Sequence, residues 1–467
     1  MAAPADGAAA VVGAGPSPSP LAETDDRALG DHPPVMDLLR FAAIGSVDDG
    51  KSTLIGRLLH DTKQLFDDQI EAVEAASRRR GVEGMDLSFV TDGLRAEREQ
   101  GITIDVAYRY AATPTRKFVI ADCPGHVQYT RNMATGASTA DLALVVVDAP
   151  KGLREQTRRH VCIAALLGVR HLIVAANKMD LIDWDESTYQ RVVAEMAVLA
   201  GRLGVESCTV VPVSALHGDN VAVRSDAAPW YDGPTILDAL EQAPAGEWAG
   251  AHGDRRGSGA RLPVQWVLRQ PGGGRTYAGM INGGPLHPGD PVVVLPSGQR
   301  STVTAVETLD GPLTEAAVGL SVSVELADDV DVSRGDLLAS ADDLPEVVTE
   351  LVATVCWFDP RPLAAGSRYR IKHTTRVTPA RILSVDGRLD VNRLEVLPAD
   401  SLAENDIGTV TLAVATPLAV DPYRRNRITG SFVIIDPTTN GTVAAGMVGP
   451  PALTPLELDS PPFDAPG

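Results

Sequence analysis

The stretch Gly45-Ser-Val-Asp-Asp-Gly-Lys-Ser52 decides the fold of the first half of this chain. It matches the pattern G-x-x-x-x-G-K-[ST], follows an apolar run that ends at Ile44, and precedes a helical pattern. Its two glycines let the backbone curl so that amide groups face phosphate oxygens, and the N-terminus of the next helix adds a favourable dipole. We therefore expect a phosphate-binding loop between a strand and a helix.

Four further segments follow this loop in a fixed order. They are Gly101-Ile-Thr103, Asp122-Cys-Pro-Gly-His126, Asn177-Lys-Met-Asp180 and Ser214-Ala-Leu216. Strands that alternate with helices form a mostly parallel sheet, and ligands bind at the carboxyl ends of its strands, where these loops lie. Each segment alone is weak, but the ordered set predicts binding and hydrolysis of GTP.

The expected roles at the phosphates follow from the chemistry of phosphoryl transfer. Lys51 is expected to reach the β- and γ-phosphates, and Ser52 to bind Mg²⁺. Asp122 is expected to hold the same ion through water. Thr103 lies in a polar segment that we interpret as a switch, in which its hydroxyl binds Mg²⁺ when the γ-phosphate is present. The alternative for Thr103 is an ordinary loop threonine.

The remaining motif residues are assigned to water and to the base. His126 is expected to orient the attacking water, the alternative being a histidine that merely starts a helix. Asp180 can accept two hydrogen bonds from guanine, and adenine offers no such donor pair. The expected catalytic residues are His126, Lys51 and Thr103, and the expected GTP-binding residues are Gly45, Ser46, Val47, Asp48, Asp49, Gly50, Lys51, Ser52, Thr53, Asp122, Cys123, Pro124, Gly125, His126, Asn177, Lys178, Met179, Asp180, Ser214, Ala215 and Leu216.

Length and composition set further bounds. With 467 residues the chain is too long for one hydrophobic core, so two or three domains are expected. A formal net charge of −20 disfavours a surface that wraps a nucleic acid, because phosphate contacts need clustered Lys and Arg. No apolar run approaches the ~18 residues of a membrane span. The widely spaced Cys123, Cys162, Cys208 and Cys356 indicate reduced thiols in a cytoplasmic protein.

The periodicity changes along the chain. Residues 36–246 are expected to form the GTP-binding domain, an α/β domain with helices on both faces of the sheet. Its expected strands are Leu39–Ile44, Lys117–Ala121, Leu142–Val147, His171–Ala176 and Thr209–Val213. Its expected helices are Ser52–Thr62, Asp67–Arg79, Val127–Thr135, Gln156–Leu167, Glu186–Leu203 and Thr235–Leu240.

In the second half, short apolar runs separated by turn residues predict two antiparallel β-barrels, over residues 262–345 and 346–449, after a linker over 247–261. Their expected strands include Pro291–Leu295, Ser301–Thr308, Leu320–Leu326, Leu351–Trp357, Arg368–His373, Ala380–Val385, Gly408–Leu412 and Gly430–Ile435. Gly272–Arg275 is expected to be a hairpin turn. Residues 1–35 and 450–467 are expected to be disordered.

This order of motifs, followed by two barrels, resembles the translation-factor class of GTPases. The stretches 41–64 (FAAIGSVDDGKSTLIGRLLHDTKQ), 91–110 (TDGLRAEREQGITIDVAYRY) and 128–139 (QYTRNMATGAST) more closely resemble the large subunit of heterodimeric sulfate adenylyltransferase. Ser333–Leu337 and Asn426–Asp436 share this resemblance, which covers about residues 36–449. Asp49 agrees with the sulfate-activating subunit, since elongation factors usually have His at that position.

The resemblance implies a divided chemistry. A separate small subunit, similar to ATP pyrophosphatases, joins ATP and sulfate to give adenosine 5′-phosphosulfate and pyrophosphate, and the large subunit couples GTP hydrolysis to that step. The implied cofactors are GTP and Mg²⁺, and the implied partner is the small subunit, with no nucleic acid and no membrane. Val127 departs from the Glu expected beside the switch histidine. Some relatives carry a C-terminal kinase, but this sequence holds no second phosphate loop, so that activity is expected elsewhere.

Two other functions remain open at this stage. A translation-type GTPase that delivers a charged tRNA has the same motif order, but it needs a cationic surface across the barrels. A GTP-dependent scaffold without catalysis is a third interpretation.

Overall fold

The computed structural model describes residues 37–65, 67–80, 85, 87–90, 103, 105–245, 259–269, 274–451 and 453. The expected N-terminal extension, the switch residues Gly101 and Ile102, most of the linker and most of the C-terminal tail lie outside the described residues. Among the described residues, no helix combines the length and the apolar character that crossing a membrane requires.

The first half folds around a six-stranded sheet with the order β2-β3-β1-β4-β5-β6. All neighbouring strands are parallel except β2, which runs antiparallel to β3. The strands are β1 Asp37–Gly45, β2 Ala107–Ala112, β3 Arg116–Asp122, β4 Leu142–Asp148, β5 His171–Asn177 and β6 Ser207–Pro212. Every residue of β4 and β5 is buried, as their unbroken apolar sequences predict for central parallel strands.

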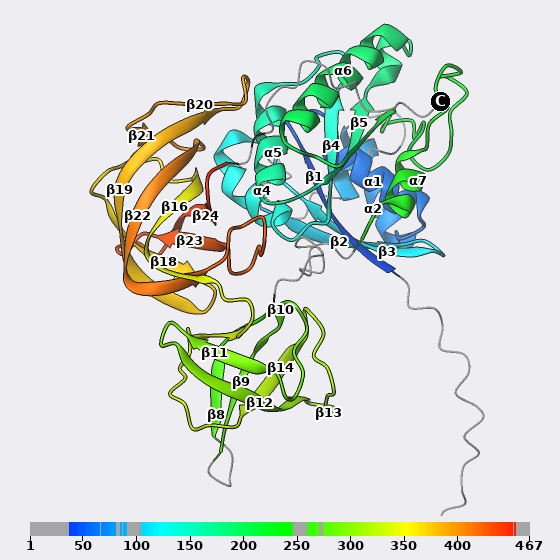
Figure 1. Cartoon of the computed structure of the whole chain (residues 1–467). Helices are drawn as coiled ribbons and strands as arrows, with labels where there is room; N and C mark the ends of the chain where they lie inside the picture. The colour runs from blue at the N-terminus through cyan, green and yellow to red at the C-terminus, as the bar shows by residue number, and fades with distance from the viewer. Residues whose placement is uncertain are drawn as a thin grey trace, which may run out of the picture. The chain divides into compact units, whose positions relative to one another are not determined.

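Helices cover both faces of this sheet, with α4 and α5 on one side and α1 and α7 on the other (Figure 1). The α-helices are α1 Lys51–Asp61, α2 Asp67–Arg80, α4 Thr130–Ala137, α5 Glu155–Leu166, α6 Glu186–Arg202 and α7 Ile236–Gln242. The short 3-10 helices are η1 Leu87–Val90, η2 Val127–Tyr129 and η3 Met179–Ile182. The side chain of Asp185 caps α6, and Thr235 and Asp238 form a capping box at the start of α7.

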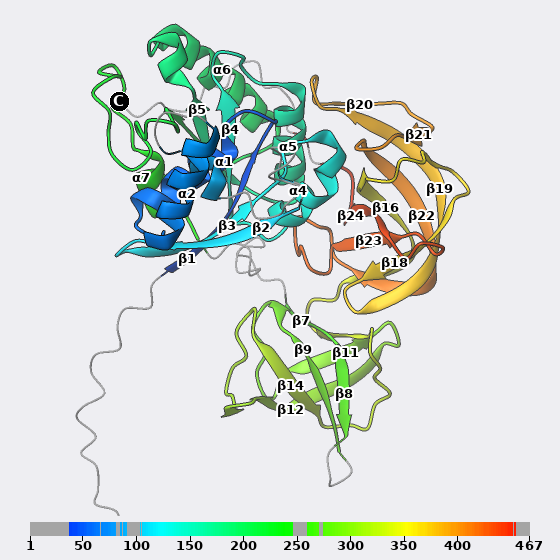
Figure 2. The same ribbon diagram turned by 180° about the vertical axis from the view of Figure 1, so that it is seen from behind.

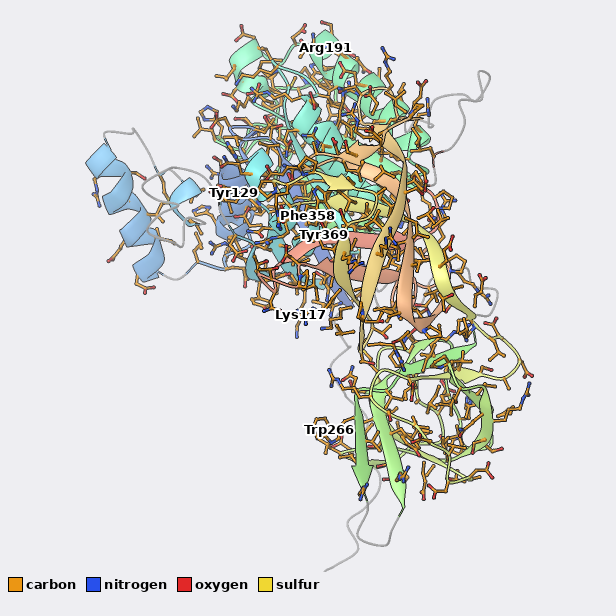
Figure 3. All side chains as sticks on the ribbon, turned by 90° about the vertical axis from the view of Figure 1, so that its left-hand side faces the viewer. Lys117, Tyr129, Arg191, Trp266, Phe358 and Tyr369 are labelled. Carbon is orange, nitrogen blue, oxygen red and sulfur yellow. The ribbon has the colours of Figure 1, made fainter. Side chains whose placement is uncertain are left out.

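The chain then forms an antiparallel sheet with its own apolar core (Figure 2). Its strands are β7 Ala260–Pro263, β8 Trp266–Arg269, β9 Arg275–Met280, β10 Asn282–Gly283, β11 Pro291–Leu295, β12 Gln299–Thr308, β13 Gly311–Pro312, β14 Ser321–Leu326 and β15 Leu337–Ser340. Strands β8 and β9 pair in antiparallel fashion with Arg269 opposite Arg275, and Gly272 and Gly273 of the expected hairpin turn lie outside the described residues. Trp266 lies exposed on β8 (Figure 3).

The last part is a closed antiparallel barrel, because β18 pairs with both β23 and β19. Its strands are β16 Glu346–Trp357, β18 Arg368–His373, β19 Arg376–Asp390, β20 Glu395–Leu397, β22 Ile407–Val420, β23 Ser431–Ile435 and β24 Thr442–Val448, beside a small pair of β17 Leu363–Ala364 and β21 Ser401–Leu402. The fold class expected from the sequence is confirmed: an α/β GTP-binding fold is followed by antiparallel β-structure.

Two elements differ from the expectations. The edge strand β2 carries exposed Tyr108 and Tyr110 and has no continuous apolar run, so the apolar pattern did not reveal it. Strand β7 begins at Ala260, inside the expected linker, because Ala260 and Arg261 pair with β10 and Arg261 also pairs with β15.

Apolar packing crosses from the first sheet to the closed barrel. The largest buried cluster surrounds the six-stranded sheet, and it also contains barrel residues such as Cys356, Leu389 and Met447. The cluster inside the 260–340 sheet includes no residue of the six-stranded sheet among those described. Part of the barrel therefore packs into the core of the first sheet, while the barrel also holds a separate apolar core of its own.

Candidate functional site

Two glycines shape the loop between β1 and α1. Gly45 ends β1 with φ 149°, and Gly50 precedes α1 with φ 95°, both positive values that favour glycine. A Cβ atom at Gly45 would lie 2.4 Å from the Val146 carbonyl oxygen, and one at Gly50 would lie 2.3 Å from the Asn177 side-chain nitrogen. The expected phosphate-binding loop therefore has the tight conformation that its sequence predicts.

The Lys51 ammonium group lies inside this loop. Its Nζ atom donates hydrogen bonds to the carbonyl oxygens of Gly45 (3.1 Å) and Ser46 (2.7 Å). Burial lowers the pKa of Lys51, and the nearby carboxylates of Asp49 and Asp122 oppose that shift. The loop thus holds a buried cation whose hydrogen bonds a phosphate group can replace.

The buried Asp49 carboxylate holds the loop in place through hydrogen bonds. Its Oδ2 atom accepts hydrogen bonds from the Ser46 amide (2.8 Å) and the Thr157 hydroxyl (3.4 Å), while the Ser46 and Thr157 hydroxyls lie 2.9 Å apart. Its Oδ1 atom is buried without a hydrogen-bond partner among the described residues. Burial raises the pKa of Asp49, and Lys51 works against this rise. Thr157, at the start of α5, belongs to no sequence motif and was not expected here.

The Asp122–His126 segment reaches the same loop. Asp122 ends β3 and is buried, and a Cβ atom at Gly125 would lie 2.4 Å from Lys51 Nζ. Gly125 is therefore packed directly against the phosphate-binding loop. The Cys123 side chain instead lies in the apolar core, where its thiol donates to the Ala121 carbonyl oxygen at 3.5 Å and burial raises its pKa. The neighbouring Pro124 is also buried.

His126 begins the short helix η2. Its ring is half-buried, its Nδ1 atom accepts a hydrogen bond from the Gln128 amide at 3.3 Å, and its centroid lies 6.0 Å from that of Tyr129. The next residue, Val127, is 40% exposed. The ring is thus placed by contacts within its own short segment.

Asn177 joins three loops. Its side-chain nitrogen donates to the Asp49 carbonyl oxygen at 2.8 Å, and its side-chain oxygen accepts from the Ala215 amide at 2.9 Å. All three residues are buried. One amide side chain therefore connects the phosphate-binding loop to the expected base-binding loops.

Lys178 makes a second connection. It has φ 67°, and its ammonium group bonds to the Asp48 carbonyl oxygen at 2.5 Å and to Asp148 at 2.7 Å. Burial alone would raise the pKa of Asp148, but hydrogen bonds from Lys178 and Lys151 outweigh it and hold that pKa below its usual value. Asp148 ends β4, and no motif marked it, although a carboxylate directly after an apolar strand is the signal that could have revealed it.

The expected base-binding residues differ in how far they are buried. Met179 and Ser214 are buried and support the loops, and Leu216 is 53% exposed. The Asp180 side chain is 20% exposed, with His217 Nε2 3.9 Å from its carboxylate. Arg57 of α1, which sequence reasoning missed, donates to the carbonyl oxygens of Ala215 (3.4 Å) and Leu216 (2.6 Å).

The expected metal ligands are only partly brought together. Ser52 lies half-buried in the first turn of α1, followed by Thr53, and Asp122 is close enough to Lys51 to influence its pKa. Thr103 is half-buried, but its neighbours Ile102 and Ile104 lie outside the described residues. Oxygen donors of this kind suit Mg²⁺, which binds few protein ligands and usually keeps waters and substrate phosphates.

Comparisons with known proteins agree with this geometry. The profile of the family described as "Elongation factor Tu GTP binding domain" matches residues 36–245, and the profile described as "GTP-eEF1A C-terminal domain-like" matches residues 350–449. Both matches fall on the regions that the structure divides into an α/β fold and a closed barrel.

Among similar whole proteins, "Sulfate adenylyltransferase subunit 1" of Laribacter hongkongensis is 49% identical over 415 residues, which cover 88% of this chain and 85% of that protein. The protein of the same name from Chromobacterium violaceum is 48% identical over 432 residues, covering 90% of this chain and 89% of its own length. "Bifunctional enzyme CysN/CysC" of Mycobacterium tuberculosis is 54% identical over 417 residues, covering 88% and 67%.

Proposed function

Because this chain belongs to the sulfate adenylyltransferase subunit 1 family and carries an Elongation factor Tu-type GTP-binding domain, we propose that it hydrolyses GTP to drive sulfate activation. In this proposal a separate small subunit, similar to ATP pyrophosphatases, forms adenosine 5′-phosphosulfate and pyrophosphate from ATP and sulfate. The sulfate–phosphate anhydride is very costly to form, and a second nucleotide hydrolysis offsets that cost. With its four thiols free, the chain is assigned to the reducing cytoplasm.

The main support for the proposal is that hydrogen bonds connect the loops of the expected GTP site. The Asn177 side chain connects the loop around Lys51 to the loop of Ala215. In this proposal the loop that binds the phosphates and the loop that binds the base are therefore held together before the nucleotide binds. A frame held before binding reduces the ordering cost of binding. Asp180 stands at the base end, where its carboxylate favours guanine over adenine.

Each residue then has a role at the phosphates. Lys51 exchanges its loop carbonyl partners for the β- and γ-phosphates, where it counters the charge of the transition state. The amide of Gly125 binds the γ-phosphate, and the His126 ring orients the attacking water. The Ser52 and Thr103 hydroxyls, together with Asp122 through water, would hold Mg²⁺, and the ion would supply charge neutralisation at the phosphate oxygens.

The deciding experiment measures GTP hydrolysis by the chain mixed with the small subunit of a related heterodimer. A rate that rises only when ATP and sulfate are both present supports coupling to sulfate activation. If GTP binds but its rate of hydrolysis stays the same when ATP and sulfate are added, the proposal is contradicted. A filter assay for tRNA binding then tests the translation-type alternative. The variant His126→Ala separates catalysis from a scaffold role. If the chain is a scaffold, the variant should have the same partner-stimulated rate of GTP hydrolysis as the unmodified chain.

A further inference from the structure

The segment that follows the expected base-binding motif has an unusual backbone. Asp180 lies in the short helix η3, and the two residues after that helix, Asp183 and Trp184, have φ values of 49° and 57°. Left-handed conformations are uncommon in residues other than glycine, and they usually occur singly. Such a backbone persists only where the surrounding structure holds it, and it is often found at functional sites.

Backbone hydrogen bonds close this turn onto the base-binding motif. The amides of Asp183 and Trp184 both donate to the Met179 carbonyl oxygen, the second at 3.0 Å. The Met179 amide donates in turn to the Val213 carbonyl oxygen at 3.2 Å, just after β6. Asp180 is therefore enclosed in a turn whose two ends, at Met179 and Trp184, are joined to each other.

The outer end of this turn is held by a side chain from another loop. The indole Nε1 atom of Trp230 donates a hydrogen bond to the Trp184 carbonyl oxygen at 3.1 Å. Both indole rings are partly buried and pack against the core of the six-stranded sheet. Trp230 lies between β6 and α7, so this bond connects the turn after Asp180 to a loop 46 residues further along the chain.

Two buried tyrosines hold the Trp230 ring. Its centroid lies 5.1 Å from that of Tyr189 and 6.3 Å from that of Tyr231, and the two tyrosine rings meet edge to face at 6.0 Å. The Tyr189 hydroxyl donates to the Val210 carbonyl oxygen of β6 at 3.0 Å, and the Tyr231 hydroxyl donates to that of Pro234 at 2.8 Å. Trp230 therefore belongs to an aromatic cluster that is fixed to the sheet.

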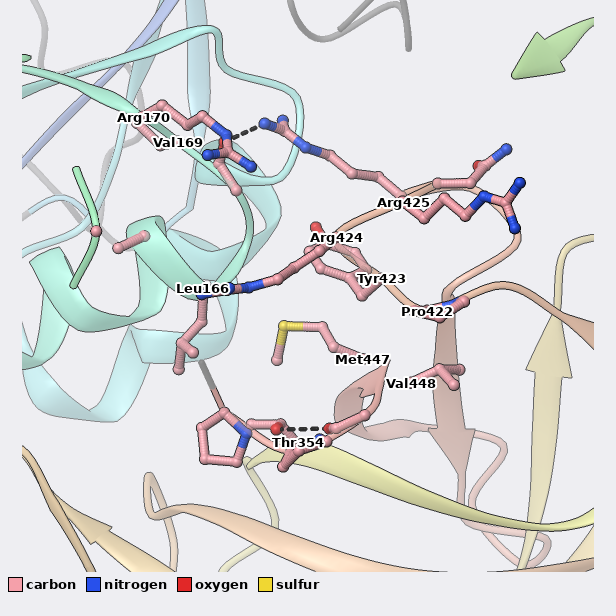
Figure 4. A pocket seen from close by; sticks show the side chains of 18 of the residues that line it. Leu166, Val169, Arg170, Thr354, Pro422, Tyr423, Arg424, Arg425, Met447 and Val448 are labelled. Atoms are coloured by element: carbon pink, nitrogen blue, oxygen red, sulfur yellow. Dashed lines mark hydrogen bonds between the residues drawn. The ribbon is translucent and has the colours of Figure 1, made fainter. Parts of the chain in front are cut away.

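Aromatic and cationic donors at another junction of the chain have a simpler explanation. In the pocket of about 350 Å³ between α5, α6 and the closed barrel (Figure 4), the Tyr423 hydroxyl and the Arg427 guanidinium donate to the carbonyl oxygens of Leu167 and Gly168. Both acceptors lie just past α5, where donors commonly complete the end of a helix. The Trp230 bond differs, because its acceptor is a residue in a left-handed conformation four positions after Asp180.

We propose that Trp230 is a positioning residue for guanine recognition: its indole N–H holds the Trp184 carbonyl group, and through that turn it fixes the direction of the Asp180 carboxylate. This inference rests on the proposed function, in which Asp180 accepts two hydrogen bonds from guanine. A carboxylate that is already directed toward the base needs less ordering when the nucleotide binds. Loss of the Trp230 bond should therefore weaken the contacts with the base and leave the phosphate contacts of the Lys51 loop unchanged.

The test compares GDP with inosine 5′-diphosphate, which lacks only the 2-amino group of guanine. Because the phosphates are identical, the ratio of the two dissociation constants reports the bond between that amino group and the carboxylate. Competition against a fluorescent GDP derivative measures both constants on the full chain. The unmodified chain should bind GDP at least about tenfold more tightly, since one hydrogen bond to a charged group is missing with inosine.

Trp230→Phe keeps an aromatic ring beside Tyr189 but removes the N–H donor. We expect it to lower the preference for GDP by about threefold or more, and a smaller decrease overturns the proposal. Trp266→Phe, at the exposed tryptophan of β8, is the matched control and should keep the preference of the unmodified chain. Circular dichroism and thermal unfolding show whether each variant is folded.

A double-mutant cycle shows whether Trp230 acts through Asp180. In the background of Asp180→Ala, Trp230→Phe should change neither dissociation constant by more than about twofold, because the carboxylate that it positions is gone. An effect as large as in the unmodified chain indicates a general structural role and overturns the proposal. If Asp180→Ala itself leaves the preference for GDP unchanged, guanine recognition by Asp180 fails together with this inference. A preference that responds to Asp180→Ala and not to Trp230→Phe overturns this inference alone.

A variant pair at Asp183 tests the turn without touching the aromatic cluster. The Asp183 side chain is exposed, so its replacement leaves the core packing intact. Asp183→Asn keeps a residue type that tolerates the left-handed conformation, whereas Asp183→Val introduces a β-branched side chain that does not. The preference for GDP should fall in Asp183→Val and be kept in Asp183→Asn. Equal preferences in the two variants overturn the role of the turn.

Discussion

Asp180→Ala is the sharpest test of base recognition, because the structure separates this carboxylate from the frame that holds its loop. Asn177 and Lys178 fix the loop through contacts that do not involve Asp180. The nearest ionisable partner of the carboxylate is the His217 ring at 3.9 Å, which is beyond hydrogen-bond distance. Truncation at Asp180 should therefore leave the loop in place and remove only its contacts with the base.

The size of the effect follows from the two hydrogen bonds expected with guanine. Each bond to a charged group contributes about 1.5–3 kcal/mol, so losing both costs about 3–6 kcal/mol. That range corresponds to about 10²- to 10⁴-fold weaker GTP binding. ATP never makes these bonds, so its affinity should stay the same or improve slightly.

Equilibrium titration with fluorescent derivatives of GTP and ATP measures both affinities on the same preparation. Asp226→Ala, at an exposed position of the same domain, is the matched control and should change neither affinity. If the ratio of GTP to ATP affinity changes less than about tenfold in Asp180→Ala, the assignment of Asp180 to guanine is wrong.

Two further predictions concern stability. Burial, together with the charges of Lys51 and Arg159, lowers the pKa of His160 from 6.5 to about 3, so the folded chain keeps this ring neutral while the unfolded chain protonates it. The free energy of unfolding that depends on the neutral ring is fully present above pH 6.5 and falls by on the order of 2 kcal/mol by pH 5. In urea unfolding, His160→Gln should therefore lose less stability between pH 7 and pH 5 than the unmodified chain. Equal losses in the two proteins would contradict this reasoning. Arg261→Met leaves the buried Asp421 carboxylate without its bidentate partner and should cost about 3–5 kcal/mol of unfolding free energy, whereas a cost below about 1 kcal/mol would show that the pair is dispensable.

The sequence predicted the parts of the site that lie within continuous motifs. The loop over Gly45–Ser52 needs its glycines for local backbone reasons, so the pattern alone determines its conformation. Strands β4 and β5 were predictable because burial on both faces demands unbroken apolar runs. The role of each motif residue toward GTP, including the switch around Thr103, stays a prediction.

The supporting residues could not be predicted in this way. Thr157, Asp148 and Arg57 act across distances of 30 to 159 positions in the sequence, and each is an ordinary residue of a helix or a strand end. Only the folded topology brings them to the loops. The edge strand β2 was missed for a related reason. One face of an edge strand is exposed to solvent, so its apolar and polar residues alternate, and short sequences also show such alternation by chance.

The shared core around the six-stranded sheet bears on how this chain can be divided. A fragment ending near residue 245 would expose to water the apolar surface that Cys356, Leu389 and Met447 normally cover, and such a surface favours aggregation. The 260–340 sheet meets the closed barrel through a small apolar cluster of four of its residues with Ala419, and through the ion pairs Arg261–Asp421 and Arg376–Asp336. Truncation or recombination that keeps the first and last parts of the chain together therefore preserves the apolar packing that the two share.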